Sequence, residues 1–161
     1  CMKYTDVLDM AERPIRALSG GQRQRVLLAK VLAQQTPVLF LDEPAAGLDL
    51  FYQEQIFRFC RELSARGKTV VMVVHELNLA DRYCSRLMLL KQGNVLADAA
   101  PQQVLTDELL SAGYGTAIHA RRNLETGHAD IYTEELPLTS AKRELLDTII
   151  GVDYQKGGEA L

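Results

Sequence analysis

The chain has 161 residues, of which 47% are hydrophobic and 24% charged, and its formal net charge is −3. This balance is typical of a globular chain of one domain or a large part of one. Lysine and arginine are scattered along it, which argues against a nucleic-acid-binding face, and its longest apolar run, residues 70–74, is far too short to span a bilayer.

The three cysteines are odd in number and lack metal-ligand or redox spacing, as is typical of reduced thiols in a cytosolic protein. The chain begins with Cys1 and shows no signal-peptide pattern. We therefore expect an excerpt that starts within a longer protein, the alternative being a lipidated N-terminal cysteine.

Helices and strands are predicted to alternate along the first two thirds of the chain, because amphipathic spacing marks the helices and short apolar runs mark the strands. In chain order we expect a helix over 20–35, a strand over 38–41, a helix over 49–66, a strand over 69–74, a helix over 77–83 and a strand over 86–91.

The strands at 38–41 and 69–74 are wholly apolar, which predicts burial on both faces. The helix between them, closed by Gly67, makes a strand–helix–strand unit. Such a unit places its two strands parallel in one sheet. We therefore predict an α/β fold with a parallel sheet core.

The last third of the chain predicts smaller elements. Gly93-Asn94 between two strand-like runs is typical of a tight hairpin turn. We expect a helix over 101–111, strands over 117–121 and 129–132 around a turn at 123–127, a helix over 140–150, and disorder near 156–159.

A glycine pair stands directly ahead of the first predicted helix. Ser19 is a good N-cap, and Gly20 and Gly21 expose backbone amides that no Cβ shields. These amides and the helix dipole favour a phosphate ligand. The alternative is a turn that merely starts a helix.

Two acids, Asp42 and Glu43, end the first predicted strand, at the sheet edge where α/β proteins bind ligands. Adjacent carboxylates are costly there unless a cation or a proton relieves them. Asp42 is therefore a candidate ligand for Mg²⁺, and Glu43 a candidate to orient or deprotonate an attacking water. The alternative is a pair of exposed acids that cap the next turn.

His75 ends the second predicted strand, at the same sheet edge. The parallel unit is expected to bring it beside the acids, where an imidazole could reach a terminal phosphate. A structural histidine is the alternative. Asp49 is a plausible N-cap of the helix that follows it.

These segments together resemble the motifs of the ATP-binding-cassette (ABC) ATPases, in the same order, over residues 14–75. Leu18-Ser19-Gly20-Gly21-Gln22 resembles the ABC signature sequence. The run at 38–44 resembles a Walker B motif with its catalytic glutamate, 46–49 resembles the D-loop, and His75 resembles the switch histidine. The stretches at 104–110, 114–115 and 125–127 look like those of ATPases that serve iron-chelate, haem and cobalamin importers.

The resemblance implies the C-terminal part of a three-layer P-loop NTPase fold. Residues 1–113 would belong to the ATPase domain, 114–152 to a small α/β extension, and 153–161 to a disordered tail. Catalysis is expected from Glu43 and His75, binding of Mg²⁺ from Asp42, and contacts to ATP from the residues of the signature and the D-loop, namely Ser19, Gly20, Gly21, Gln22 and Asp49.

By the same resemblance, two subunits sandwich two ATP molecules, and each signature serves the partner's γ-phosphate. The expected partners are a second ATPase subunit, transmembrane permease subunits and, indirectly, a periplasmic or extracellular substrate-binding protein, but no nucleic acid. The expected location is the cytoplasmic face of the cell membrane.

Three family features are missing from the sequence: the Gly-rich phosphate loop (Walker A), the aromatic residue that stacks on adenine, and the glutamine loop. In the family they precede the signature, so we expect them before Cys1, and we expect this chain alone to be inactive. His119 and His128 lack ligand spacing and are given no role.

Two other classes of protein compete with the transporter interpretation. A soluble ABC ATPase of ribosomes would usually show Thr-Asn-His-Leu-Asp where this chain has residues 45–49, and DNA-repair members insert long coiled coils, of which there is no sign here. A non-catalytic binding protein on the same half-fold is disfavoured by Glu43 and His75.

Overall fold

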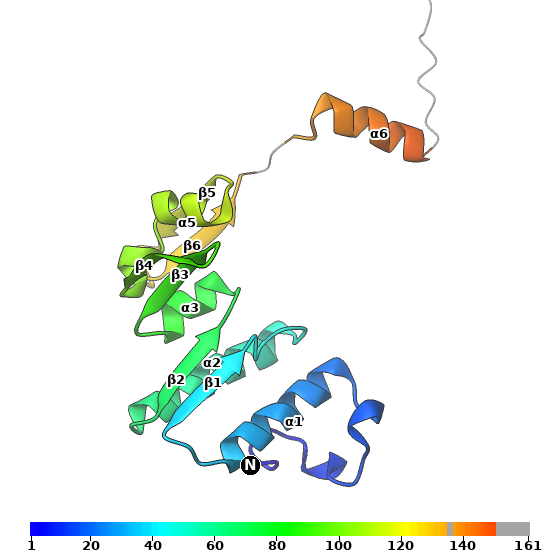
Figure 1. Ribbon diagram of the computed structural model, residues 1–161, viewed down its shortest axis with the longest axis vertical. Coiled ribbons are helices and arrows are strands. Elements are labelled where there is room, and N and C mark those ends of the chain that lie inside the picture. Colours follow the sequence, from blue (N-terminus) through cyan, green and yellow to red (C-terminus); the bar gives the residue numbers. More distant parts are fainter. Residues whose placement is uncertain (135–136, 151–161) are drawn as a thin grey trace, which may run out of the picture.

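The computed structural model describes residues 1–134 and 137–150 (Figure 1). The predicted tail at 153–161 lies outside them. The elements are, in chain order, two 3-10 turns at Leu8–Met10 and Ile15–Ala17, then α1 (Gly20–Ala33), β1 (Val38–Asp42), α2 (Leu50–Ala65), β2 (Thr69–Val73), α3 (Leu77–Tyr83), β3 (Leu87–Lys91), β4 (Asn94–Ala99), α4 (Pro101–Val104), α5 (Asp107–Tyr114), β5 (Ile118–Arg122), β6 (Ala129–Thr133) and α6 (Ser140–Ile150).

β1 and β2 pair in parallel, as the strand–helix–strand pattern predicts, with Val38 opposite Thr69 and Asp42 opposite Val73. The pairs β3–β4 and β5–β6 are antiparallel hairpins. In the described part of the chain these strands form three separate two-stranded sheets. The register of β1 against β2 brings the ends of both strands to one edge.

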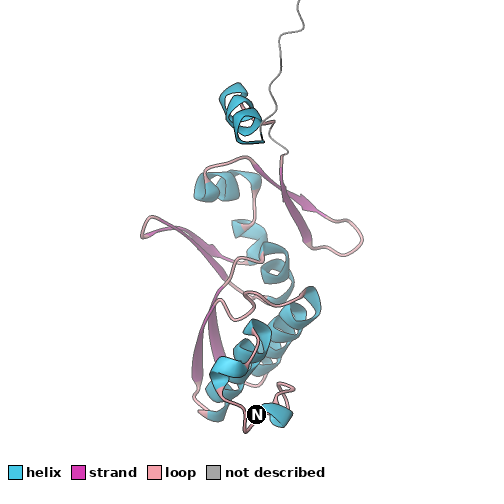
Figure 2. Cartoon of the chain, turned by 90° about the vertical axis from the view of Figure 1, so that its right-hand side faces the viewer, coloured by secondary structure: helices cyan, strands magenta, loops and turns pink. Residues whose placement is uncertain are grey.

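One face of the β1–β2 sheet carries the main core. Helices α1 and α2 lie on this side (Figure 2), and Leu41 of β1 packs there with Leu28, Ile56 and Cys60. Burial raises the pKa of the Cys60 thiol to about 12, as expected for a thiol without contact with water.

The other face of this sheet is open, contrary to the prediction that both strands are buried on both faces. Phe40 is 75% exposed, and its cross-strand partner Val71 and the neighbouring Val38 and Val73 are also exposed. The apolar run does alternate between covered and open positions, but nothing in the described chain packs on the second face.

Local turn chemistry explains where several elements end. Gly67 follows α2 with φ +83°, the left-handed conformation that closes helices. The β3–β4 turn uses Gln92 and Gly93, with φ of +48° and +78°, the two left-handed residues of a type I′ hairpin. This turn lies one residue earlier than predicted.

The predicted helix over 101–111 is two helices. α4 ends at Val104, and Thr106 then starts α5 as an N-cap, with its Oγ1 accepting a hydrogen bond from the Leu109 amide at 3.3 Å. Thr106 is extended, with φ −120° and ψ 153°, so the helix cannot run through it.

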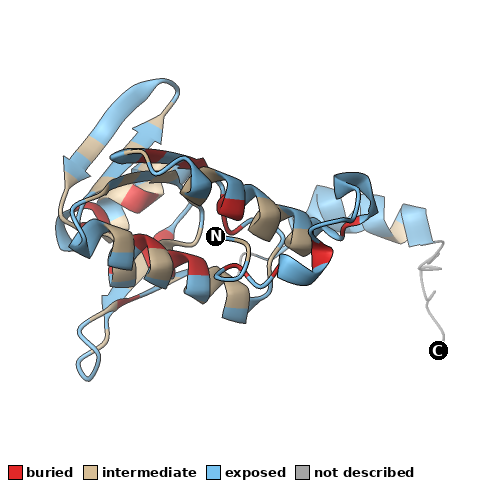
Figure 3. Ribbon diagram, turned by 90° about the horizontal axis from the view of Figure 1, so that it is seen from below, coloured by how far each residue is buried: buried red, intermediate tan, exposed pale blue. Residues whose placement is uncertain are grey.

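The hairpin β5–β6 is joined to the rest of the chain by an apolar cluster and by polar contacts. Leu105, Leu110 and Ile118 are buried together, with Leu77 of α3 packed against them. The core therefore continues across the predicted boundary between residues 113 and 114. By contrast, α6 stands apart from the other elements (Figure 1), and none of its residues is buried (Figure 3).

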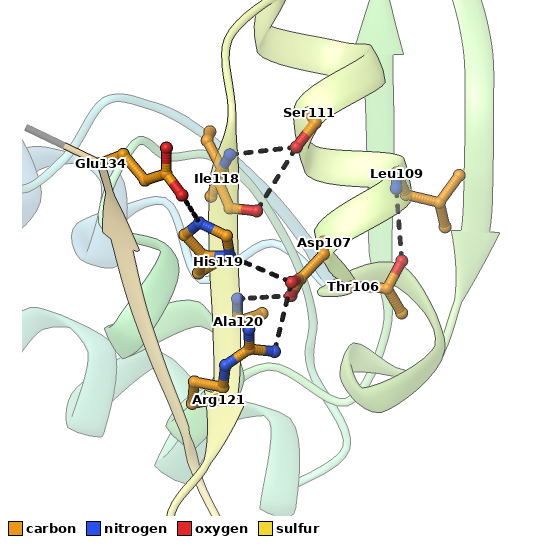
Figure 4. Close-up of polar contacts among 9 residues, drawn as sticks. All are labelled: Thr106, Asp107, Leu109, Ser111, Ile118, His119, Ala120, Arg121 and Glu134. Atoms are coloured by element: carbon orange, nitrogen blue, oxygen red, sulfur yellow. Dashed lines mark hydrogen bonds and ion pairs between the residues drawn. The ribbon is translucent and has the colours of Figure 1, made fainter. Parts of the chain in front are cut away.

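His119 of β5 lies between two carboxylates (Figure 4). Its Nδ1 is 3.2 Å from Asp107 Oδ2 and its Nε2 is 2.9 Å from Glu134 Oε1. The other oxygen of Asp107 accepts a hydrogen bond from the Ala120 amide at 2.8 Å. The hydrogen bonds to Glu134 and Asp107 raise the pKa of His119, and the Ala120 amide, followed by His119, lowers the pKa of Asp107.

A second polar group forms around Asp81 of α3, whose side chain is 1% exposed. It accepts hydrogen bonds from the Ala129 amide at 2.8 Å and from Arg122 Nη1 at 3.2 Å, and it lies 3.1 Å from His128 Nδ1. The two histidines that the sequence leaves without a role therefore take part in contacts that hold the hairpin in place.

Candidate nucleotide-hydrolysis site

The predicted acids and the predicted histidine meet at one end of the β1–β2 sheet. Asp42 is the last residue of β1, and His75 follows β2 by two residues. Glu43 Oε1 lies 2.9 Å from His75 Nε2. Both side chains are open to solvent, Glu43 at 47% and His75 at 68%. The parallel pairing of the two strands is what brings residues 32 positions apart into contact.

The Glu43 contact changes the acid–base character of His75. The hydrogen bond to Glu43, together with the charge of that carboxylate, raises the pKa of His75. Glu43 therefore favours the protonated form of His75 more than in a free histidine, and an imidazolium at this edge would suit a phosphate ligand. Because both groups face water, the energy of this pair is modest.

The backbone of Glu43 is unusual, since its φ is +43° although it is not a glycine. Three hydrogen bonds hold it. Its N–H donates to the Val73 carbonyl at 3.0 Å, and its own carbonyl accepts from the Ala46 amide and from Gln24 Nε2, each at 3.1 Å. The contact of Gln24 with Glu43 could not be predicted from the sequence, because Gln24 lies on another element, α1.

The residues Leu18–Gln22, which we call the signature segment, lead into α1. Ser19 Oγ accepts from the Gln22 amide at 3.3 Å, and Gln22 Oε1 accepts from the Ser19 amide at 3.0 Å. This is a capping box, so both side chains serve the start of the helix. The capping role that the sequence allowed for Ser19 is therefore present.

The two glycines of the signature segment differ in their surroundings. A Cβ at Gly20 would meet nothing within 4 Å, whereas a Cβ at Gly21 would lie 3.1 Å from Leu48 Cδ2. Gly21 therefore allows the start of α1 to approach the loop 43–49. Gly20 leaves backbone amides of the first helical turn accessible to an anion.

Asp49 closes that loop as the N-cap of α2, with Oδ1 accepting from the Tyr52 amide at 3.0 Å. Such a cap stabilises a helix by about 1 kcal/mol. The site is thus a short loop held at Glu43 by β2 and α1 and at Asp49 by α2. A groove of about 190 Å³ beside it is lined by Gln24, Asp42 and Pro44, with apolar walls from α1 and β1.

Three acids lie at this edge: Asp42 and Glu43 at the end of β1, and Glu76 next to His75. Mg²⁺ in nucleotide sites usually takes one or two carboxylates, with waters and substrate phosphates as its other ligands, so Asp42 fits that donor set. Within residues 1–134 and 137–150, no group of three or more histidine, cysteine, aspartate or glutamate side chains could hold a metal by itself. None of the helices described there could cross a membrane.

Comparisons with known proteins agree on one family. A family model described as "ABC transporter" matches residues 1–46. The Hemin import ATP-binding protein HmuV of Rhodococcus jostii (strain RHA1) is 46% identical over 126 residues, which are 78% of this chain and 43% of that protein.

Solved structures of ABC proteins also match the fold of this chain. A metal-chelate type ABC transporter in an inward-facing conformation matches 88% of this chain and 55% of its own chain, with a TM-score of 0.68 and 26% identity. A dimeric structure of the ATP-binding cassette MJ0796, bound to ADP and Pi, matches 63% of this chain and 44% of its own, with a TM-score of 0.59 and 34% identity. The archaeal ribosome recycling factor aABCE1 also matches, with a TM-score of 0.64 and 27% identity over 91% of this chain and 28% of its own.

The chain therefore has an α/β fold similar to that of the ATP-binding cassettes in these solved structures. The chain belongs to the ABC transporter ATPase family, and its relatives include proteins named as hemin import ATP-binding proteins. It spans about half the length of the curated relatives it matches.

Proposed function

We propose that this chain is the C-terminal part of an ABC ATPase subunit that hydrolyses ATP to drive import of haem, an iron chelate or cobalamin. The observation that carries the proposal is the contact of Glu43 with His75, at 2.9 Å, beside Asp42 at the end of the parallel strands. The identity with a hemin import protein favours haem among these substrates.

In the proposed mechanism Glu43 accepts the proton of the attacking water. His75, whose protonated form Glu43 favours, donates a hydrogen bond to the terminal phosphate. Asp42 would hold Mg²⁺, which when bound neutralises charge on the phosphates. The family's phosphate loop, adenine-stacking residue and glutamine loop would lie in the part of the protein that precedes residue 1.

The signature segment is proposed to act on the nucleotide of a second subunit. The amides at Gly20 and Gly21 begin α1 and carry the positive end of its dipole, which suits a γ-phosphate. Ser19 and Gln22 would hold this turn through their capping box and add polar contacts, and Asp49 would lie at the dimer interface. Such a site forms only when two subunits close.

The proposed partners are a second copy of the subunit and transmembrane permeases, with a substrate-binding protein reached through them. The subunit would then work at the cytoplasmic face of the membrane. Residues 1–113 would belong to the ATPase domain and 114–152 to a small extension, whose β5–β6 hairpin packs on that domain. A ribosome-associated ATPase is the alternative that the fold also permits, but the 46% identity to an import ATPase favours the transporter.

The test is Glu43→Gln in the complete subunit. The amide keeps the shape of the side chain but cannot accept the proton, so we expect hydrolysis to fall at least about a hundredfold. ATP binding should persist, and a closed dimer should accumulate. Glu62→Gln, on the exposed side of α2, is the matched control and should keep full turnover. Hydrolysis by Glu43→Gln at the wild-type rate would refute the proposal.

The substrate is tested separately in proteoliposomes that hold the complete transporter. Hemin, a ferric chelate and cobalamin are each supplied with the substrate-binding protein, and the stimulation of ATP hydrolysis is measured. We expect hemin to stimulate most. If only cobalamin stimulates ATP hydrolysis, cobalamin and not haem is the substrate. If none of the three compounds stimulates it, the assignment as an importer is wrong.

A further inference from the structure

Helix α1 contacts the loop 43–49 at two points. In its first turn, Gly21 allows Leu48 to approach so closely that a Cβ would lie 3.1 Å from Leu48 Cδ2. In its second turn, Gln24 Nε2 donates a hydrogen bond to the Glu43 carbonyl at 3.1 Å, across 19 residues of sequence. Helix α1, which begins with the signature segment, therefore contacts the loop 43–49 near both of its ends, at Glu43 and at Leu48.

The contact at Glu43 falls on a backbone that needs support. A residue with a Cβ adopts a φ of +43° only where its surroundings hold it. The N–H of Glu43 is fixed by the Val73 carbonyl of β2 and its C=O by the Ala46 amide of its own loop. Gln24 supplies the remaining bond, and it is the one that comes from the signature helix.

The orientation of this peptide decides where the Glu43 side chain points. With the carbonyl held toward α1, the carboxylate reaches His75 Nε2 at 2.9 Å. A shift or rotation of α1 would pull on the Glu43 carbonyl and so move the carboxylate relative to His75. The Gln24 side-chain amide thus connects helix α1 to the loop that carries Glu43.

We propose that Gln24 is a positioning residue, which couples the signature segment to the catalytic carboxylate of the same subunit. The inference rests on the proposed function, in which the signature segment serves the partner's nucleotide and Glu43 serves the subunit's own. Docking of α1 on the partner's γ-phosphate would then be transmitted through Gln24 to Glu43, so that each site is readied for hydrolysis by closure at the other.

The test compares Gln24→Met with Gln34→Met in the complete subunit. Methionine has nearly the length of glutamine but no N–H donor. Gln34, exposed at the C-cap of the same helix, controls for the change from polar to apolar. For Gln24→Met we expect kcat to fall about tenfold, the size of effect of one lost hydrogen bond, with KM changed less than about twofold. Gln34→Met should behave as wild type.

A second measurement separates positioning from a structural role. In the Glu43→Gln background, Gln24→Met should leave the ATP-dependent dimer intact on gel filtration, because Gln24 acts on the carboxylate and not on closure. A wild-type kcat for Gln24→Met, or loss of the dimer together with a raised KM, would overturn the inference. Glu43→Gln alone, assayed in parallel, tests the proposed function: if it retains turnover, the proposed function fails whatever Gln24 does.

Discussion

At the level of single residues, Gly20 and Gly21 of the signature segment differ in what an added side chain would contact. Gly21 lies against Leu48, so a side chain there would require Leu48 to shift. Gly20 faces open space, so a side chain at this position meets nothing within its own chain. Gly20 is therefore the position at which docking on a partner can be tested without disturbing the fold.

We predict that Gly20→Asp in the complete subunit leaves ATP binding by the monomer unchanged but abolishes dimer closure and hydrolysis. The carboxylate would stand where the partner's γ-phosphate docks, and like charges repel at contact distance. Binding is measured by calorimetry and closure by gel filtration with ATP.

Mixing Gly20→Asp with Glu43→Gln subunits gives the control. In the mixed dimer one site carries both changes and the other carries neither, so partial ATPase activity should return. A Gly20→Asp monomer that cannot bind ATP would show that the signature segment belongs to its own subunit's site, contrary to the proposed sharing.

At the scale of elements, the β5–β6 hairpin is fixed by two polar groups that reach across the chain. Asp81 of α3 accepts hydrogen bonds from the Ala129 amide and from Arg122, at the turn end of the hairpin. Asp107 and Glu134 hold His119 on the other side. Asp81 lies on α3, the helix that follows His75, so the attachment of the hairpin also fixes α3.

We predict that Asp81→Leu destabilises the chain by about 2–4 kcal/mol, because it leaves the buried Ala129 amide without its acceptor and removes the carboxylate that pairs with Arg122. Urea denaturation measures the loss, and the Ala129 amide should exchange faster with deuterium. Glu125→Leu, in the exposed hairpin turn, should change stability by less than about 0.5 kcal/mol. Equal effects of the two substitutions would contradict a specific role for Asp81.

The His119 group predicts a pH dependence. Because the folded pKa of His119 is raised, its contribution to stability is complete below the unfolded value, about 6.5, and is lost as pH rises through the folded pKa. The pKa of Asp107 is lowered, so its contribution is present above about pH 4 and is lost in acid. The attachment of β5 should therefore be strongest between these limits.

Thermal denaturation of wild type and His119→Gln from pH 5 to pH 9 checks this expectation. The difference in Tm should be largest near pH 5–6 and should shrink as pH rises. A difference that is constant over this range would mean that the charge of His119 does not contribute.

At the scale of the whole molecule, the open face of the β1–β2 sheet is the largest departure from a complete domain. Phe40, Val71 and Val73 lie exposed on two paired strands. Full burial of one such side chain stabilises a folded protein by about 1.5–3 kcal/mol. Packing of another segment on this face would therefore be favourable.

We predict that the 161-residue chain alone neither binds Mg·ATP tightly nor hydrolyses it. It has no phosphate loop, and without that loop the triphosphate lacks both its cradle of backbone amides and its lysine. Calorimetry with Mg·ATP should give a dissociation constant well above micromolar, and the complete subunit is the positive control. Micromolar binding by the short chain would contradict the assignment of the phosphate grip to another part of the protein.

Features that depend on local spacing could be predicted from the amino-acid sequence alone. The alternation of apolar runs and helical periods predicts β1, α2 and β2 and their parallel pairing, because a crossover helix leaves few other arrangements. Asp42, Glu43 and His75 stand at the ends of these strands and Ser19 at the start of α1, so their places follow once the elements are known. Their order also carried the resemblance to the ABC family.

The tertiary structure alone decided which distant side chains meet. Gln24 forms a hydrogen bond to Glu43 across 19 residues of sequence, and Arg122 forms one to Asp81 across 41. Neither contact could be predicted, because it leaves no periodic pattern in the sequence. The exposure of Phe40 was equally unpredictable, because an apolar strand has the same sequence whether or not another element covers it. Local chemistry sets the elements, but contacts between them depend on how the chain packs in space.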